Sequence, residues 1–160
     1  MANEEAIKKE ISQRFGMAEE SIRVARERRV FCEVGYDAFR GFLEHVCKKM
    51  GFAILCTITG QDEGETLSFM YHTARSDGTM LNIKTSVLKS DPRIKTVTDL
   101  YPVAISYERE LVDLLGAAVE GLPPGKRYPL PDGWPEGQYP LRKDWKPDQL
   151  GDMAFPIKGA

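Results

Sequence analysis

The residues of this chain whose types could do chemistry gather in one turn of a predicted helix. The turn carries three carboxylates and one guanidinium, at Glu108, Arg109, Glu110 and Asp113. Two carboxyl groups with different surroundings can act as a general acid and a general base. However, no histidine and no nucleophile motif lies nearby, and Arg109 precedes Asp113 by four residues, so that the two can pair. The turn is better explained as an ion network or a docking surface, and we assign no catalytic residue.

A second charged group, Arg142, Lys143 and Asp144, follows Pro140. It is either a solvated turn or a contact that fastens the chain to a partner. Together with an aromatic anchor on the preceding segment, the two groups form the docking set that the sequence predicts: Glu108, Arg109, Glu110, Asp113, Trp134, Arg142, Lys143 and Asp144.

Metal and cofactor motifs are not evident in the sequence. Cys32, Cys47 and Cys56 lack the short spacing of zinc or iron–sulfur ligands. Cys47 and Cys56 fall on apolar faces of predicted elements, which favours packing in the core, and His45 and His72 have no motif around them. No glycine-rich phosphate loop follows a predicted strand. We therefore predict no metal and no cofactor.

Composition excludes several function classes. The 160 residues suit one soluble domain, with 42% hydrophobic and 29% charged residues. A net charge of −2 disfavours a nucleic-acid binder, and Glu27 interrupts the basic run from Arg23 to Arg29. No apolar run reaches the roughly 20 residues of a membrane span, and the N-terminus lacks an apolar signal core. We expect a cytosolic protein that meets a membrane only through partners.

Hydrophobic periodicity predicts the elements that position these residues. In chain order we expect a helix closed by Gly16, an extended segment over 22–34, a helix over 37–50, strands over 52–59, 67–73 and 80–88, and a helix begun by Pro102. The second helix carries one continuous apolar stripe of Phe39, Phe42, Leu43, Val46, Cys47 and Met50. The last helix should turn inward a stripe of Val103, Tyr107, Leu111 and Leu114. This order predicts an α+β, two-layer fold: helix, strand, helix and a three-strand antiparallel meander, with two helices over one face of a mixed four-stranded sheet.

The final forty residues have a different character. Eight of the ten prolines lie beyond Gly121, which excludes regular helix or interior strand there. The same stretch carries large apolar side chains, at Tyr128, Leu130, Trp134, Tyr139, Leu141, Trp145, Met153, Phe155 and Ile157. We therefore divide the chain into an α+β domain, residues 1–120, and an extended docking arm, residues 121–160. The arm lies either on a partner or, as in a self-contained binding or enzymatic domain, on its own sheet.

The charged turn and the arm resemble a known family. Order, spacing and residue type over Thr98–Ala104, Tyr107–Glu110, Asp113–Gly116 and Pro140–Asp144 are similar to the 30 kDa subunit of respiratory NADH:quinone oxidoreductase (complex I). The preceding elements are also similar, so the resemblance covers nearly the whole chain. The run from Leu130 to Gly137 is more like the related subunit of membrane-bound, energy-converting nickel–iron hydrogenases and formate hydrogenlyases.

The resemblance implies a role without catalysis. Members of the family bind no flavin, iron–sulfur cluster or quinone of their own. They pack in the peripheral arm of the complex, beside the large subunit that forms the quinone or nickel site and near the iron–sulfur subunits, on the cytoplasmic side of the membrane. Which parent complex contains this chain stays open between NADH dehydrogenase and hydrogenase.

Overall fold

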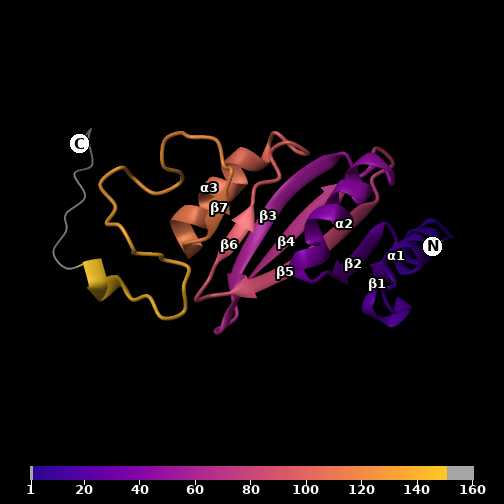
Figure 1. Cartoon of the computed structure of the whole chain (residues 1–160), viewed down its shortest axis with the longest axis horizontal. Helices are drawn as coiled ribbons and strands as arrows, with labels where there is room; N and C mark the ends of the chain where they lie inside the picture. The colour runs from indigo at the N-terminus through magenta and orange to yellow at the C-terminus, as the bar shows by residue number, and fades with distance from the viewer. Residues whose placement is uncertain (1, 151–160) are drawn as a thin grey trace.

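A mixed five-stranded sheet, ordered β1-β2-β5-β4-β3, forms the body of the protein (Figure 1). The computed structural model describes residues 2–150. Its helices are α1 (Ala2–Phe15), α2 (Tyr36–Lys48) and α3 (Ala104–Leu115), with 3-10 turns at Glu19–Ser21 and Pro147–Leu150. Its strands are β1 (Arg23–Arg26), β2 (Arg29–Glu33), β3 (Ile54–Asp62), β4 (Thr66–Ala74), β5 (Met80–Leu88), β6 (Arg93–Lys95) and β7 (Ala118–Glu120). The predicted α+β class and antiparallel β3-β4-β5 meander are confirmed.

The main sheet has five strands instead of the predicted four, and the two short strands β6 and β7 were not predicted. The extended segment over 22–34 folds into the β1–β2 hairpin, and β2 then pairs in parallel with β5. The chain reverses at Arg28, which has a positive φ of 58°. The buried carboxylate of Glu4 accepts the Arg28 N–H at 2.6 Å. A contact between residues so distant in sequence leaves no periodic signal, so the turn was not predicted.

Helices α2 and α3 cover the same face of the sheet. The ring of Phe39 on α2 lies 4.7 Å from that of Tyr71 on β4. Gly60 on β3 pairs with Phe69, on the same face as Tyr71, and a Cβ at Gly60 would collide with Leu111 and Leu115 of α3. Helix α1 packs beside α2, so three helices rather than the predicted two form the second layer. Within residues 2–150, the fully buried apolar side chains all lie between Ile7 and Ala117.

A small parallel sheet, β6–β7, frames the charged helix. The Ala118 N–H donates to the Pro92 carbonyl at 3.0 Å, and the Thr96 N–H donates to the Glu120 carbonyl at 2.9 Å. The sheet therefore joins the two ends of the block that contains α3. Among the helices of residues 2–150, none combines the length and apolar content that a bilayer crossing requires.

Candidate functional site

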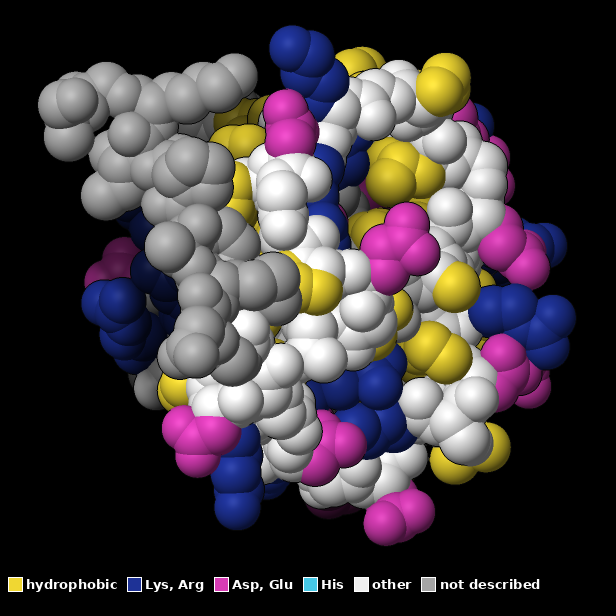
Figure 2. Space-filling view, turned by 90° about the vertical axis from the view of Figure 1, so that its left-hand side faces the viewer, with side chains coloured by type: hydrophobic (Ala, Val, Ile, Leu, Met, Phe, Trp, Pro, Cys, Tyr) yellow, Lys and Arg dark blue, Asp and Glu magenta, His cyan; other side chains and the backbone are white. Residues whose placement is uncertain are grey.

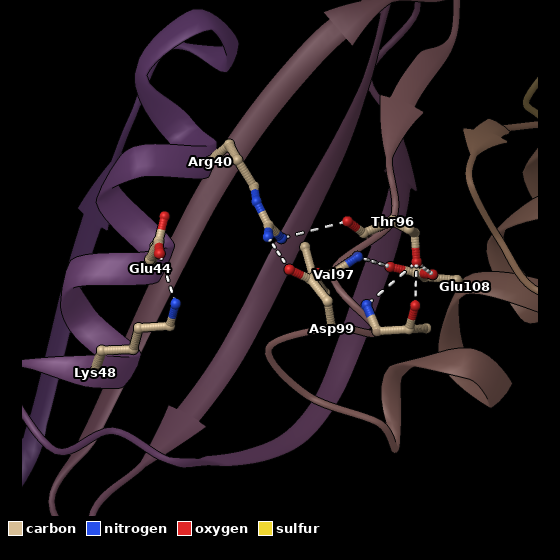
Figure 3. A network of polar contacts seen from close by, with 8 residues as sticks. Arg40, Glu44, Lys48, Thr96, Val97, Asp99 and Glu108 are labelled. Atoms are coloured by element: carbon tan, nitrogen blue, oxygen red, sulfur yellow. Dashed lines mark hydrogen bonds and ion pairs between the residues drawn. The ribbon is translucent and has the colours of Figure 1, made fainter.

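Glu108, the first residue of the predicted docking set, lies inside the protein rather than on its surface. Its carboxylate accepts the Val97 N–H at 2.7 Å and the Thr96 hydroxyl at 2.6 Å (Figure 3). Burial raises the pKa of Glu108, and the two hydrogen bonds act in the opposite direction. The side chain thus holds the loop between β6 and α3 and is not available to a partner in this structure.

The position of Glu108 also corrects the predicted inward stripe of α3. Ala104, Glu108, Leu111 and Leu115 are buried, whereas Val103 is 48% exposed. Leu111 is buried as predicted, but Tyr107 and Leu114 are only partly buried and the buried face includes the charged Glu108, which an apolar stripe does not reveal. The Thr96 and Val97 donors make its burial possible.

A guanidinium extends this network to α2. Arg40 donates to the Thr96 carbonyl at 3.4 Å and pairs with Asp99, while Glu44 and Lys48 form a separate pair along the helix (Figure 3). The loop between β6 and α3 is therefore fixed from both helices. This positions α3 relative to the sheet.

Arg109 and Asp113 do not form the predicted pair. Arg109 Nη2 donates to the carbonyls of Pro123 and Pro124, at 3.3 and 3.1 Å. A Cβ at Gly125 would collide with the same guanidinium, so the arm passes directly over Arg109. The i,i+4 prediction failed because the returning arm offers Arg109 other acceptors.

Asp113 instead holds the next part of the arm. Its buried carboxylate accepts Arg127 Nε at 2.9 Å and the Leu130 N–H at 3.1 Å. Arg127 also donates through Nη1 to the Trp134 carbonyl at 2.6 Å. Through Arg109 and Asp113, α3 therefore binds residues 123–130, and Arg127 extends the contact to Trp134.

Trp134 orders the bend of the arm. Its Nε1 donates to the Gln138 carbonyl at 2.8 Å, and Trp145 Nε1 donates to the Gln138 side-chain oxygen at 2.7 Å. The two indole centroids lie 6.1 Å apart. Both tryptophans are partly buried, and their bonds to Gln138 hold residues 134–145 of the arm together.

Arg142 binds the arm to the C-terminal end of α3. Its Nε donates to the Leu115 carbonyl at 2.7 Å, and its guanidinium lies 4.6 Å from the centroid of the Tyr139 ring. Gly116 ends the helix with a φ of 71°, and a Cβ there would lie 2.5 Å from the Tyr139 ring. Only glycine allows both the left-handed cap and this close approach.

Lys143 and Asp144 contact Asp62, the last residue of β3, and Lys89, which directly follows β5. The Lys143 N–H donates to Asp62 at 2.9 Å, while Lys89 Nζ lies 2.7 Å from Asp62 and 2.9 Å from Asp144. Burial acts to raise the pKa of Asp62, but the bonds from Lys89, Gly64 and Lys143 outweigh it and lower the pKa to about 2. Neither Asp62 nor Lys89 was in the predicted set, since nothing local in the sequence marks them.

The structure therefore divides the predicted docking residues by role. Arg109, Asp113, Arg142 and Asp144 hold the chain's own arm. Glu110 is partly buried, and its side chain has no hydrogen bond or ion pair within residues 2–150. Seen from the side that carries the arm, hydrophobic side chains emerge between charged ones (Figure 2).

The cysteines do not form a site in the described part of the chain. Burial raises the pKa of the Cys32 thiol to about 12. Cys47 is partly buried, as predicted, but Cys56 is exposed, because a bulge between Leu55 and Thr57 shifts the alternation of β3. Within residues 2–150, no group of three or more His, Cys, Asp and Glu side chains could hold a metal ion.

An α+β domain with a charged C-terminal helix that binds a proline-rich extension of the same chain defines the structural class of this protein. The model of the respiratory-chain NADH dehydrogenase 30 kDa subunit family matches residues 32–149, and the chain belongs to this family. The resemblance predicted from the sequence is thus confirmed.

Similar proteins are subunits of several different complexes. Membrane-bound hydrogenase subunit beta of Pyrococcus furiosus is 28% identical over 152 residues, which are 91% of this chain and 88% of that protein. The C subunit of NADH-quinone oxidoreductase from Moorella thermoacetica is 31% identical over 113 residues, 69% of this chain and 75% of that protein. A chain in the structure of a membrane-bound sulfane sulfur reductase, an archaeal respiratory membrane complex, superposes with a TM-score of 0.79 at 28% identity, covering 98% of this chain and 95% of its own.

Proposed function

We propose that this chain is a non-catalytic subunit of the peripheral arm of a complex I-type NADH:quinone oxidoreductase and supports its assembly. The observation that carries the proposal is the family match, which spans both the sheet domain and the arm, residues 32–149. The arm in turn is built for contact: polar bonds fix its course, while Tyr128 and Leu141 remain 53% and 54% exposed. Large exposed apolar side chains on an ordered segment are typical of interaction sites.

We assign a different role to each of the two regions of the chain. Residues 1–120 form the domain that carries the apolar core, and residues 121–160 form the docking arm. The partners are the large subunit that forms the quinone or nickel site and the neighbouring iron–sulfur subunits. The chain is peripheral on the cytoplasmic side of the membrane, binds no cofactor and meets the membrane only through these subunits.

Affinity purification of the tagged chain from membranes of its native host tests this role. We expect the other subunits of the complex to co-purify. Lys143 is exposed and its ammonium has no hydrogen bond or ion pair within residues 2–150, so Lys143→Glu alters the docking surface without removing a bond of the arm. It should lower the co-purified subunits about tenfold.

The matched control is Lys9→Glu, the same charge change on α1 at the opposite end of the molecule (Figure 1). It should leave the yield of the complex unchanged. Recovery of the wild-type chain alone, without any other subunit, would contradict the proposed function.

A second candidate is the equivalent subunit of a membrane-bound nickel–iron hydrogenase or formate hydrogenlyase. The match to a membrane-bound hydrogenase subunit beta over 91% of this chain favours it. The large subunit that co-purifies separates the two candidates. Two paired-cysteine nickel motifs in its sequence indicate a hydrogenase, and their absence excludes this second candidate.

A further inference from the structure

Strand β3 is the outermost strand of the five-stranded sheet, and part of its outer edge is open. The Glu63 N–H donates to the Thr66 carbonyl at 2.9 Å, which makes these two residues a hydrogen-bonded pair. Such pairs alternate along an antiparallel ladder. Thr57, Thr59 and Gln61 therefore bond to β4, while the N–H and C=O groups of Ile58 and Gly60 point away from it.

The outward backbone groups of Ile58 and Gly60 have no hydrogen-bond partner in the described part of the chain. Natural edge strands are commonly protected by lysine, proline or a covering segment. The residues from Thr57 to Gln61 include neither lysine nor proline. The edge is thus a template for one further strand.

Two fixed points bound this open stretch. At one end, the Tyr107 hydroxyl donates to the Cys56 carbonyl at 2.7 Å. At the other, the Lys143 N–H binds Asp62 at 2.9 Å. The residues 57–61 between them span about 17 Å of strand, enough for a short extended peptide.

A groove of about 200 Å³ runs beside this edge, between β3 and α3. Its α3 side is formed by the apolar side chains of Leu111, Leu114 and Leu115, and the arm contributes Leu141, which is 54% exposed. Glu110 is its one charged lining residue, and its carboxylate has no partner within residues 2–150. The groove therefore offers an apolar floor, a free carboxylate and an unpaired backbone.

We propose that an extended segment of a neighbouring subunit adds to β3 as a sixth strand, places an apolar side chain against Leu114 and Leu141, and sets a lysine or arginine beside Glu110. Strand addition of this kind draws affinity from main-chain hydrogen bonds and specificity from alternate side chains. The inference rests on the proposed function, because the partner is one of the other subunits of the same complex.

Charge favours a partner segment over a second copy of this chain. Two β3 edges paired about a two-fold axis would bring two copies of the same groove together, each carrying the carboxylate of Glu110. Like charges in one contact disfavour that dimer. A basic extended segment has the complementary charge.

Hydrogen exchange on the intact complex and on the free chain tests the proposal. The amides of Ile58 and Gly60 should exchange at least about 100-fold more slowly in the complex. Those of Thr57 and Thr59 are the internal control, since they bond to β4 in both states. Glu110→Lys should abolish the added protection, while Glu65→Lys, on the exposed turn between β3 and β4, should preserve it.

The outcomes separate the two proposals. If the other subunits co-purify but Ile58 and Gly60 exchange equally in both states, strand addition is wrong and the assembly role stands. If protection appears in the free chain as its concentration rises, a second copy occupies the edge, and the partner-segment proposal is overturned. If none of the other subunits is recovered with the chain, both proposals fail.

Discussion

The sheet domain and the arm are stabilised by different kinds of interaction. The fully buried apolar side chains of residues 2–150 lie between Ile7 and Ala117, so the described part of the arm adds none. The arm is held by hydrogen bonds and ion pairs to α3 and to Asp62. Apolar burial is cooperative and large, whereas a partly exposed polar contact contributes only about 0.5–1.5 kcal/mol. We therefore expect the arm to detach from α3 under milder conditions than those that unfold the domain.

The two tryptophans of the chain make this comparison measurable. Both Trp134 and Trp145 lie in the arm, so tryptophan fluorescence reports the arm, whereas far-UV circular dichroism reports the helices and the sheet. Together, the two signals show whether a substitution affects the arm or the sheet domain.

Loss of an apolar side chain from the core should destabilise the domain more than any substitution in the arm. Phe42 is fully buried on α2 and packs 4.7 Å from the ring of Phe15. Phe42→Ala should lower the free energy of unfolding by about 3–5 kcal/mol, because it removes buried apolar area and leaves a cavity. Urea denaturation followed by circular dichroism measures this. Leu88→Ala, at a side chain that is 60% exposed, is the control and should change stability little.

Asp62, on β3, also binds the arm. Asp62→Asn should lower the free energy of unfolding by about 2 kcal/mol at pH 7, because it weakens the bonds from Lys89, Gly64 and Lys143. The pKa of Asp62 is lowered from 3.8 to about 2, so its contribution is complete above its ordinary pKa and is lost as pH falls toward 2. Urea denaturation at a series of pH values should therefore show a smaller loss of stability over that range for the asparagine variant. Equal pH profiles would contradict this role, and Asp132→Asn, on an exposed part of the arm, is the control.

Gly116→Ala should release the arm without unfolding the domain. The alanine must adopt a φ of 71°, and its Cβ would lie 2.5 Å from the Tyr139 ring. We expect these two strains to lower the stability of the arm by about 1–2 kcal/mol. The tryptophan emission maximum should shift toward that of solvated indole, while the far-UV circular dichroism spectrum stays native. Gly16→Ala has a similar φ of 64° but no atom within 4 Å of the new Cβ. That control should cost stability without changing the fluorescence.

Substitution of Arg109 should change stability only slightly. Arg109→Ala removes the donors to the Pro123 and Pro124 carbonyls, which can bind water instead because this contact is exposed. We expect a loss of about 0.5 kcal/mol in the stability of the arm, seen as an earlier fluorescence transition in urea. The exposed Arg26→Ala in β1 should leave that transition in place. A large loss of domain stability would show that the two regions are not separable.

Local patterns in the sequence determined a substantial part of this protein. The apolar stripe of α2, the meander from β3 to β5 and the proline-rich arm follow from periodicity and backbone restriction, and each appears in the structure. The motifs around α3 also predicted the family that the comparison confirmed. These features are local because a helix face, an alternating strand or a proline is read within a few residues.

Which of these residues are in contact depends on the three-dimensional fold. The turn at Arg28 depends on Glu4, Glu108 is buried because Thr96 and Val97 supply donors, and Arg109 and Asp113 each bind the arm instead of one another. Pairings of this kind join segments that are far apart along the chain, and several acceptors compete for each donor. The competition is settled by the geometry of the folded chain, so no local spacing could have predicted it.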